Sequence, residues 1–203
     1  MLLSMTLIVG SDTAAKVLSQ DGVNPIFVAW TRFALASLVL LPFSGLRGAD
    51  APALRDGRVW LRALLIMAGI CCILTALRTE PIANAFGAFF IGPIVAFALS
   101  ALLLKERITL VRSVLLGVSF VGVLLVVKPG FGATIGMGFA VLAGVFHGGY
   151  VVATRWIAPL YRPRVLLMTQ LILGAFLLAP FGIATLPAAL SWAGVALIAA
   201  SAM

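Results

Sequence analysis

Long apolar runs, separated by short polar or charged clusters, dominate the chain. A helix that crosses a bilayer needs about 20 mostly apolar residues, because lipid offers no hydrogen-bond partner to unpaired backbone groups. Charged residues, prolines and glycines break the chain into seven such runs and the start of an eighth. In the uncharged segment 165–203, only Pro180, Gly182 and Pro187 mark a boundary. We therefore expect helices at residues 2–19, 25–43, 60–77, 81–104, 109–127, 136–156 and 165–179 (extending toward 183), with an eighth that begins near residue 191.

The composition excludes an ordinary soluble domain. Of the 203 residues, 63% are apolar and 10% are charged. With a mean hydropathy of +1.21, the surface of the chain cannot be mostly wet. A disulfide-stapled secreted domain is excluded too, since the two cysteines, Cys71 and Cys72, are adjacent within an apolar run. The predicted fold class is all-α integral membrane, and the expected location is the cytoplasmic (inner) membrane.

The formal net charge of +8 comes from cations scattered between the apolar runs. If the N-terminus is cytoplasmic, ten of the 14 lysines and arginines fall in inner loops and two, Arg78 and Lys128, in outer loops. The last two, Lys16 and Arg32, lie within helices. This positive-inside bias predicts a cytoplasmic N-terminus and argues against a nucleic-acid partner. The inner-loop cations are Arg47, Arg55, Arg58, Arg62, Lys105, Arg107, Arg112, Arg155, Arg162 and Arg164.

An offset of 138 residues aligns residues 10–43 with residues 148–181 without a gap, and eight of these 34 positions are identical. Chance matches in so apolar a sequence are the alternative explanation. However, the matches include Pro25 with Pro163 and a Pro-Phe pair at the end of both segments, and prolines mark helix boundaries. We therefore interpret the alignment as an internal repeat. A repeat of five helices, an odd number, inverts the second copy in the membrane, as in many secondary transporters.

The repeat also predicts the domain organisation. We expect a first five-helix repeat at residues 1–130 and a second, incomplete repeat at residues 131–203. By the same offset the second repeat would end at about residue 268, roughly 65 residues beyond Met203. We therefore interpret the chain as a transporter fold truncated after about seven and a half helices. The first helix is expected to stay in the mature protein, because no basic segment typical of a signal peptide precedes it.

Polar residues within the apolar helices are candidates for a binding site. An ionisable group at membrane depth costs about 2.5–3.5 kcal/mol and should face a cavity or a partner. In the first helix, Asp12 and Lys16 share one face, and the simplest alternative is that they only neutralise each other. The repeat aligns Asp12 with Tyr150 and Lys16 with Thr154. The first helices of both repeats thus have polar residues at the same depth.

The second helices also match, with Arg32 aligned to Gln170. Four helices with polar atoms at matched positions are typical of the walls of a central cavity. His147, the only histidine, is either a hydrogen-bonded core residue or, with an ordinary pKa of about 6.5, a proton carrier. In the cavity, Lys16 and Arg32 would hold an anionic group. The predicted substrate cavity is lined by Asp12, Lys16, Trp30, Arg32, Asn84, His147, Tyr150 and Gln170.

Other polar and small residues have structural explanations. Glu80 is expected to form an interfacial ion pair with Arg78, and Pro93 predicts a kink in the fourth helix. No Walker loop, HExxH pair, metal-ligand cluster or Gly-x-Ser-x-Gly elbow occurs, so we expect neither an enzyme nor a cofactor. Two alternatives stay open: an inactive fragment or scaffold, and a membrane-embedded enzyme that uses His147 and a carboxylate.

Several motifs resemble those of the EamA-type drug/metabolite transporter superfamily. They are the segment LLKERIT at residues 103–109, LGV at 116–118, VGVLLVVKPG at 121–130, EPIANA at 80–85 and Gly92-Pro93. The resemblance covers the chain from residue 2 to about residue 181. It implies ten helices in two inverted five-helix repeats around a central cavity, and it gives Pro93, Glu106, Arg107 and Gly117 a structural role in the family motif.

The resemblance also implies a function. It indicates a secondary active transporter, a permease or exporter that moves small metabolites or drugs by alternating access, with proton coupling left open. Within the superfamily the chain is most similar to bacterial metabolite permeases, including a group that takes up S-adenosylmethionine. The expected partners are a small-molecule substrate and the lipid bilayer, and a homodimer is left open.

Overall fold

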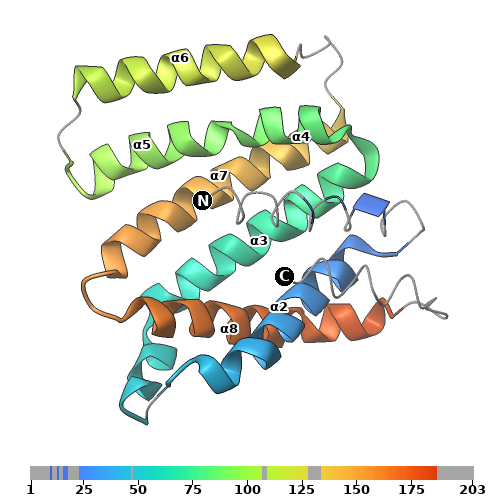
Figure 1. The fold of residues 1–203 in the computed structure, drawn as a ribbon, viewed down its shortest axis with the longest axis vertical. Helices are drawn as coiled ribbons and strands as arrows, with labels where there is room; N and C mark the ends of the chain where they lie inside the picture. Colours follow the sequence, from blue (N-terminus) through green and yellow to red (C-terminus); the bar gives the residue numbers. More distant parts are fainter. Residues whose placement is uncertain are drawn as a thin grey trace.

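The computed structural model describes Gly10, Thr13, Lys16, Val17 and residues 23–46, 48–106, 109–127 and 134–186. The regular structure of these residues is helical, with seven α-helices and two 3-10 helices (Figure 1). The α-helices are α2 (Pro25–Leu40), α3 (Gly57–Thr79), α4 (Ile82–Phe89), α5 (Ile91–Leu103), α6 (Leu110–Val127), α7 (Ile135–Ile157) and α8 (Pro163–Ala184). The 3-10 helices are η1 (Leu41–Phe43) and η2 (Gly48–Arg55).

Five helical segments of the described chain are long and apolar enough to cross a membrane. They are Pro25–Phe43, Gly57–Thr79, Ile82–Leu103, Ile135–Ile157 and Pro163–Ala184, and α6 contains a shorter apolar helix, Leu110–Gly122. The second to seventh predicted helices are therefore confirmed, with ends that move by a few residues. Most of the predicted helix at 2–19, and all of the one near 191, lie outside the described residues.

Local signals explain where the helices begin. Side-chain oxygens of Asn24, Asp56 and Thr134 accept backbone N–H bonds at the starts of α2, α3 and α7. Such N-caps satisfy donors that have no partner in the first turn. The helices α2 and α8 begin at Pro25 and Pro163, the two prolines that the 138-residue offset aligns. Proline suits a first turn because its fixed φ is helical and its missing N–H is not needed there.

Two prolines within helices act differently. The fourth predicted helix is interrupted at Phe90, between α4 and α5. Pro93 follows in the first turn of α5, where its ring excludes the normal bond to the carbonyl of Phe89. In contrast, α8 continues through Pro180 to Ala184, so Pro180 does not mark the expected boundary. Only the last helical turn follows it, and proline is tolerated in membrane helices whose freed backbone groups find other partners.

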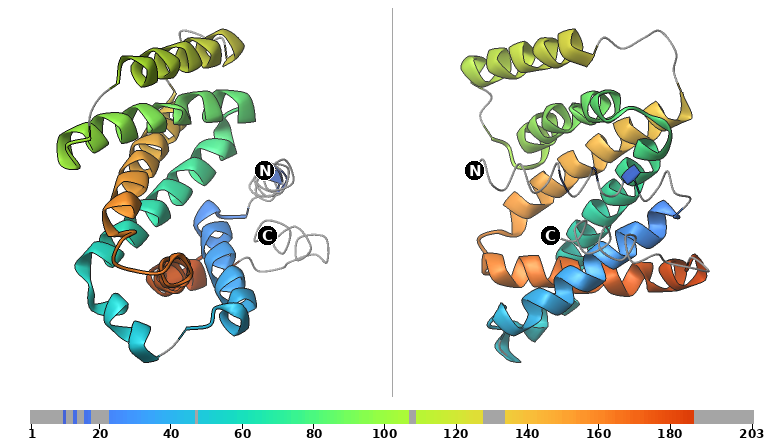
Figure 2. Two further views of the ribbon diagram at one scale, coloured as in Figure 1. Left: turned by 60° about the vertical axis from the view of Figure 1, so that its left-hand side comes forward. Right: turned by 45° about the vertical axis from the view of Figure 1, so that its right-hand side comes forward.

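Helix α7 lies at the centre of the packing. It packs against α3 on one side and against α4 and α5 on the other, while α8 packs against α2 and α3. Figure 1 shows the resulting order, from α6 at one edge through α5, α7 and α3 to α2 and α8. The two views in Figure 2 show α6 at the edge of the bundle, beside α4 and α5.

The buried core lies between α2, α3, α7 and α8. Its largest fully buried side chains include Leu74, Leu77 and Met168. A second, smaller buried cluster joins α3, α7 and α8, and it consists of Val59, Ala63, Ile157, Leu166 and Leu173. This smaller cluster surrounds the polar group described next.

Candidate functional site

A buried arginine joins three helices. Arg62, in the second turn of α3, exposes 4% of its surface. Its guanidinium donates to Thr154 Oγ1 at 2.8 Å, to the Leu166 carbonyl at 2.7 Å and to the Tyr150 hydroxyl at 2.9 Å. One side chain thereby connects α3 to α7 and α8. We call Arg62, Tyr150, Thr154 and Gln170 the arginine cluster.

Tyr150 and Thr154 complete the bonding of the arginine cluster. The Tyr150 hydroxyl donates to Gln170 Oε1 at 3.1 Å, and the centre of the Arg62 guanidinium lies 4.8 Å from the Tyr150 ring centroid. Thr154 donates to the Tyr150 carbonyl at 2.7 Å. All these partners are neutral, and no ion pair compensates Arg62 in the described parts of the chain. Charge-assisted hydrogen bonds and the cation–π contact offset part of the desolvation cost.

The sequence of α3 explains why Arg62 is buried. Asp56 caps the helix, so α3 begins at Gly57, three residues before the predicted start. On the resulting helix, Arg62 shares a face with Val59 and Ile73, which are also buried. The assignment of Arg62 to an inner loop is therefore wrong. The predicted helix at residues 60–77 already contained Arg62, and this position within an apolar run is the signal that should have separated it from the loop cations.

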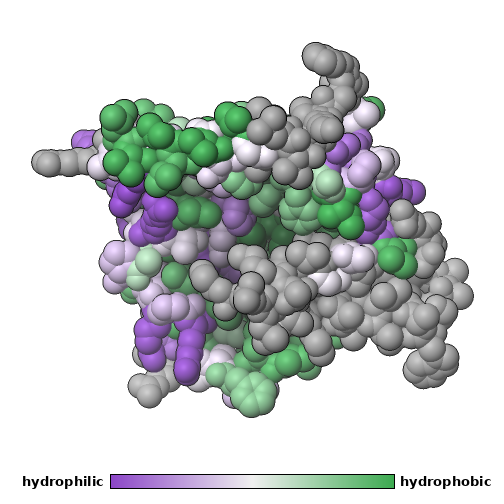
Figure 3. Space-filling view, turned by 45° about the horizontal axis from the view of Figure 1, so that its top comes forward, coloured by the Kyte–Doolittle hydropathy of each residue, from purple (hydrophilic) through white to green (hydrophobic). Residues whose placement is uncertain are grey.

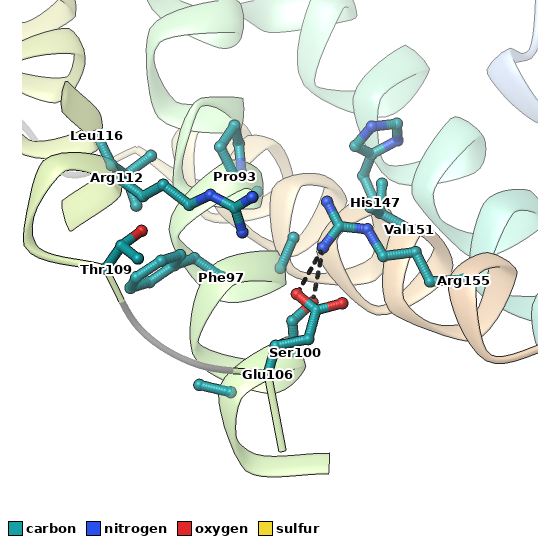
Figure 4. Close-up of a pocket in the computed structure, with 13 residues that line it drawn as sticks. Pro93, Phe97, Ser100, Glu106, Thr109, Arg112, Leu116, His147, Val151 and Arg155 are labelled. Atoms are coloured by element: carbon teal, nitrogen blue, oxygen red, sulfur yellow. Dashed lines mark hydrogen bonds and ion pairs between the residues drawn. The ribbon is translucent and has the colours of Figure 1, made fainter. Parts of the chain in front are cut away.

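His147 connects the arginine cluster to a cavity. Its ring centroid lies 5.9 Å from that of Tyr150 and 5.1 Å from that of Phe89. On its other side it lines a cavity of about 850 Å³ between α5, α6 and α7 (Figure 4). Apolar walls come from Phe97 and Val151. The cavity is therefore separated from the arginine cluster by α7 itself.

Charged residues gather at one end of this cavity. Arg155 Nη1 lies 3.3 Å from Glu106 Oε2 and 3.2 Å from Ser100 Oγ. Lys105, after the end of α5, has a left-handed backbone with φ of 53°, and this turn brings the following Glu106 back toward α7. Arg112 extends from α6 toward Arg155 across the cavity (Figure 4).

The predicted cavity residues do not all meet at one place. Tyr150 and Gln170 belong to the arginine cluster and His147 lies beside it, but two others have different partners. Lys16 Nζ donates to the Glu80 carbonyl at 2.8 Å, about 27 Å along α3 from Arg62 at 1.5 Å per residue. Trp30 Nε1 donates to the Ala175 carbonyl of α8 at 3.1 Å, where Gly182 leaves room for its ring.

The remaining predicted residues are dispersed. Arg32 is half-buried on α2 and Asn84 is half-buried on α4. Pro93 and Glu106 line the cavity, and no atom lies within 4 Å of a Cβ built on Gly117. Asp12 and Arg107 lie outside the described residues.

The prediction of an ion pair between Arg78 and Glu80 is wrong. Glu80 is buried at the end of α3, and its carboxylate accepts a hydrogen bond from the Thr134 hydroxyl at the start of α7. Arg78 instead stays exposed on α3. The packing of α7 against the end of α3 thus directs the carboxylate inward, away from the neighbouring cation.

Comparisons with known proteins identify the family. The EamA-like transporter family matches residues 1–128. The S-adenosylmethionine uptake transporters of Rickettsia prowazekii (strain Madrid E) and Rickettsia felis (strain ATCC VR-1525 / URRWXCal2) are 31% and 30% identical to this chain over 131 residues. The matched segment is 63% of this chain but 44% of the length of each relative.

A solved crystal structure shows the same fold. It is 22% identical in sequence, with a TM-score of 0.72 over 99% of this chain and 72% of that chain. This likeness extends over the described helices of both predicted repeats, whereas the family match covers the first 128 residues. The family match spans more than half of the sequence, and five helices are long and apolar enough to cross a membrane. The chain is therefore a multi-pass membrane protein that belongs to the EamA-like transporter family.

Proposed function

We propose that the protein is a secondary transporter that moves a small metabolite by alternating access, and that the arginine cluster closes one end of the substrate path. The family and both named relatives are transporters rather than enzymes. The observation that carries the proposal is the burial of Arg62, whose three hydrogen-bond partners lie on two other helices. An ionisable group in a membrane bundle is expensive and is therefore typical of a functional position.

The hydrogen bonds of the arginine cluster are suited to exchange. Hydroxyl groups both donate and accept, so Tyr150 and Thr154 can bond to Arg62 in one state and to water or substrate in another. When α3 separates from α7 and α8, the guanidinium of Arg62 loses these oxygens and gains access to a substrate carboxylate. The closed and open states therefore differ in which oxygens Arg62 binds.

The substrate class that we propose is an amphipathic metabolite with a carboxylate and a cationic or aromatic part. The names of both relatives support S-adenosylmethionine as a first compound to test. Arg62 would bind the carboxylate, and the Tyr150 ring would contact the cationic part through its π face. Gln170, which already bonds to Tyr150, would hold that ring in place.

The test is uptake of labelled S-adenosylmethionine into vesicles that contain the gene product, with the variant Arg62→Met. Methionine has a similar length and no charge, so replacing a buried ion by it should leave thermal stability unchanged or higher. Uptake should fall at least about tenfold, because the charge-assisted bonds to substrate are lost. The control is Arg78→Met, which removes an exposed arginine from the same helix. Wild-type uptake by Arg62→Met would refute the proposal.

We also propose that transport is coupled to protons through His147. The ring lies between the arginine cluster and the cavity, and an imidazole can both accept and donate a proton. The variant His147→Gln keeps a polar side chain of similar size that does not titrate. Uptake should depend on an imposed pH gradient in the wild type and should lose that dependence in the variant. Wild-type uptake that does not change with the imposed pH gradient would contradict the proposed proton coupling.

The inverted repeat at residues 1–130 and 131–203, and the cytoplasmic N-terminus, belong to the same proposal. The aligned Thr31 and Thr169 each donate to the carbonyls three and four residues earlier, which supports equivalent local structure in the two copies. With Arg62 buried within α3, nine cations in loops and helix ends on the predicted inner side still oppose two on the predicted outer side. The arginine cluster would then close the cytoplasmic side. Labelling of single cysteines placed in η2, from outside intact cells, tests this orientation, and efficient labelling would contradict it.

A further inference from the structure

The cavity between α5, α6 and α7 contains charges that the transport proposal does not use. Arg112, in the first turn of α6, and Arg155, in the last turn of α7, extend toward each other across it (Figure 4). Among the described residues that line the cavity, Glu106 is the only carboxylate, and it is paired with Arg155. Arg112 forms no hydrogen bond or ion pair with any described residue. Two guanidinium groups against one carboxylate leave one positive charge in excess.

The rest of the cavity is apolar. Phe97, Leu116 and Val151 form walls that lead from the charged end toward His147. His147 and Arg155 are eight residues apart on α7, which corresponds to about 12 Å along the helix. The cavity, of about 850 Å³, is within the usual volume range of small-molecule sites. Its shape and chemistry suit a ligand with an anionic head and an apolar tail.

The surface around the charged end is also apolar. Leu102, Leu103 and Leu110 are 74%, 69% and 80% exposed. Figure 3 shows a broad apolar surface on this side of the molecule, with polar side chains immediately beneath part of it. Exposed leucines beside arginines at helix ends are typical of the boundary between the hydrocarbon core and the lipid headgroups. We therefore expect the charged end of the cavity to lie at the depth of lipid phosphates.

We propose that this cavity binds an anionic phospholipid, with the phosphate between Arg112 and Arg155 and an acyl chain along the apolar walls. An anionic phospholipid such as phosphatidylglycerol has one net negative charge, which matches the excess charge of the lining, whereas the ammonium group of phosphatidylcholine cancels the charge of its phosphate. The planar guanidinium forms paired hydrogen bonds to phosphate oxygens, and basic pockets between membrane helices suit anionic headgroups. Arg112 and Arg155 line the α5–α6 side of α7, away from the arginine cluster that we propose for the substrate, and the exposed leucines beside them favour a lipid over the transported metabolite.

The proposal is tested on the purified whole chain by native mass spectrometry and by thermal unfolding, with phosphatidylglycerol or phosphatidylcholine added. Phosphatidylglycerol should bind and raise the melting temperature, whereas phosphatidylcholine should not. Arg112→Ala should weaken phosphatidylglycerol binding about tenfold or more, because charge-assisted bonds to phosphate are lost. Arg164→Ala is the matched control, since Arg164 is an exposed arginine in the first turn of α8 that does not line the cavity.

Two further measurements distinguish a lipid from a soluble anion. Glycerol phosphate and inorganic phosphate have the anionic group without the acyl chain, so they should bind much more weakly than phosphatidylglycerol. Leu116→Gln places a polar group in the apolar wall and should weaken lipid binding while both arginines remain. The proposal fails if Arg112→Ala binds phosphatidylglycerol like the wild type, or if the soluble phosphates bind as tightly as the lipid. Neither binding measurement depends on transport activity.

Discussion

On the side of α7 that faces α3 and α8, Arg62 is enclosed by neutral oxygen atoms and hardly reaches the surface. On the side that faces α5 and α6, the side chains of Arg155 and its partner Glu106 are 52% and 41% exposed. Both arginines hydrogen-bond to protein groups. Water screens the ion pair between Arg155 and Glu106, but it does not screen the buried hydrogen bonds of Arg62. An exposed ion pair contributes about 0–1 kcal/mol. For the buried Arg62, both the desolvation cost and the electrostatic gain from its hydrogen bonds are much larger.

The side of α7 that faces α5 combines close packing with an open cavity. Toward α5, the backbone itself makes the contact: a Cβ on Gly144 would lie 2.5 Å from the Phe89 carbonyl oxygen, and one on Gly148 would lie 2.7 Å from the Gly92 carbonyl oxygen. Beside this contact the cavity opens toward α6, and its lining extends from Gly92 and His147 to Arg155. Close backbone packing and an open cavity therefore lie next to each other on the side of α7 that faces α5.

The largest effect is expected for Gly144→Ala. The added methyl group would collide with the Phe89 carbonyl, and a backbone atom cannot move aside as a side chain can. We expect the free energy of unfolding in detergent to fall by about 3 kcal/mol, the upper part of the range for overpacking. The control, Gly138→Ala on the same helix, meets no atom within 4 Å and should be neutral or slightly stabilising. Equal effects of the two variants would refute the close contact.

The second effect compares the two arginines directly. Arg62→Ala leaves a void and removes three hydrogen bonds, so it should lower the free energy of unfolding by about 2 kcal/mol. Arg155→Ala should cost less than about 1 kcal/mol, because its ion pair is exposed. Denaturant unfolding of both variants in one detergent provides the measurement. If Arg155→Ala were the more damaging, burial would not be what distinguishes the two sites.

The positions of the helices follow from the apolar runs, because membrane depth fixes both their length and their composition. The interruption at Phe90 and the continuation through Pro180 do not follow so directly. Both depend on what replaces a lost backbone hydrogen bond. Near Pro93 the freed Phe89 carbonyl lies against Gly144 of α7, while Pro180 lies so close to the end of α8 that the helix stops within one turn.

The candidate site was predicted only in part. The sequence indicates how deep in the membrane a side chain lies, but it does not indicate the direction in which that side chain points. The repeat placed Tyr150 and Gln170 at matching depth, and both are in the arginine cluster. Trp30 was placed in the cavity as a neighbour of Arg32, but its indole packs against α8. The direction of a side chain depends on which helices pack together, and small residues such as Gly182 decide this through close contacts. Arg62 was missed because it was counted with the loop cations, although the predicted helix at residues 60–77 contained it.

A pH effect of intermediate size is expected at the start of α3, outside the membrane-spanning segments. The Asp56 carboxylate accepts hydrogen bonds from the Arg58 backbone N–H and the Tyr161 hydroxyl, and they lower the Asp56 pKa below its ordinary 3.8. Because the folded-state pKa is lowered, the stabilisation is complete above about pH 4 and is lost as the pH falls through the folded-state pKa. Asp56→Ala should cost about 1 kcal/mol at neutral pH as a lost N-cap.

The same contact predicts the opposite behaviour in alkali. The hydrogen bond to Asp56 raises the pKa of Tyr161 above its ordinary 10.0, so this contribution is present below pH 10 and is lost as the pH rises through the folded-state value. Melting temperatures across both ranges, in the wild type and in Tyr161→Phe, test the pair. The phenylalanine variant should lose the alkaline dependence and keep only part of the acidic one. An unchanged alkaline profile would contradict the contact.

The smallest effect is expected at the left-handed turn after α5, next to the cavity side of α7. Lys105 has a φ of 53°, where a Cβ is strained and glycine is not. Lys105→Gly should therefore raise the free energy of unfolding by about 0.5 kcal/mol, whereas Lys105→Ala, which also removes the charge, should give no gain. The Glu106–Arg155 pair lies one residue beyond this turn, so relief of strain should leave phosphatidylglycerol binding unchanged. A loss of stability in Lys105→Gly relative to Lys105→Ala would mean that the left-handed turn is not what directs Glu106 toward α7.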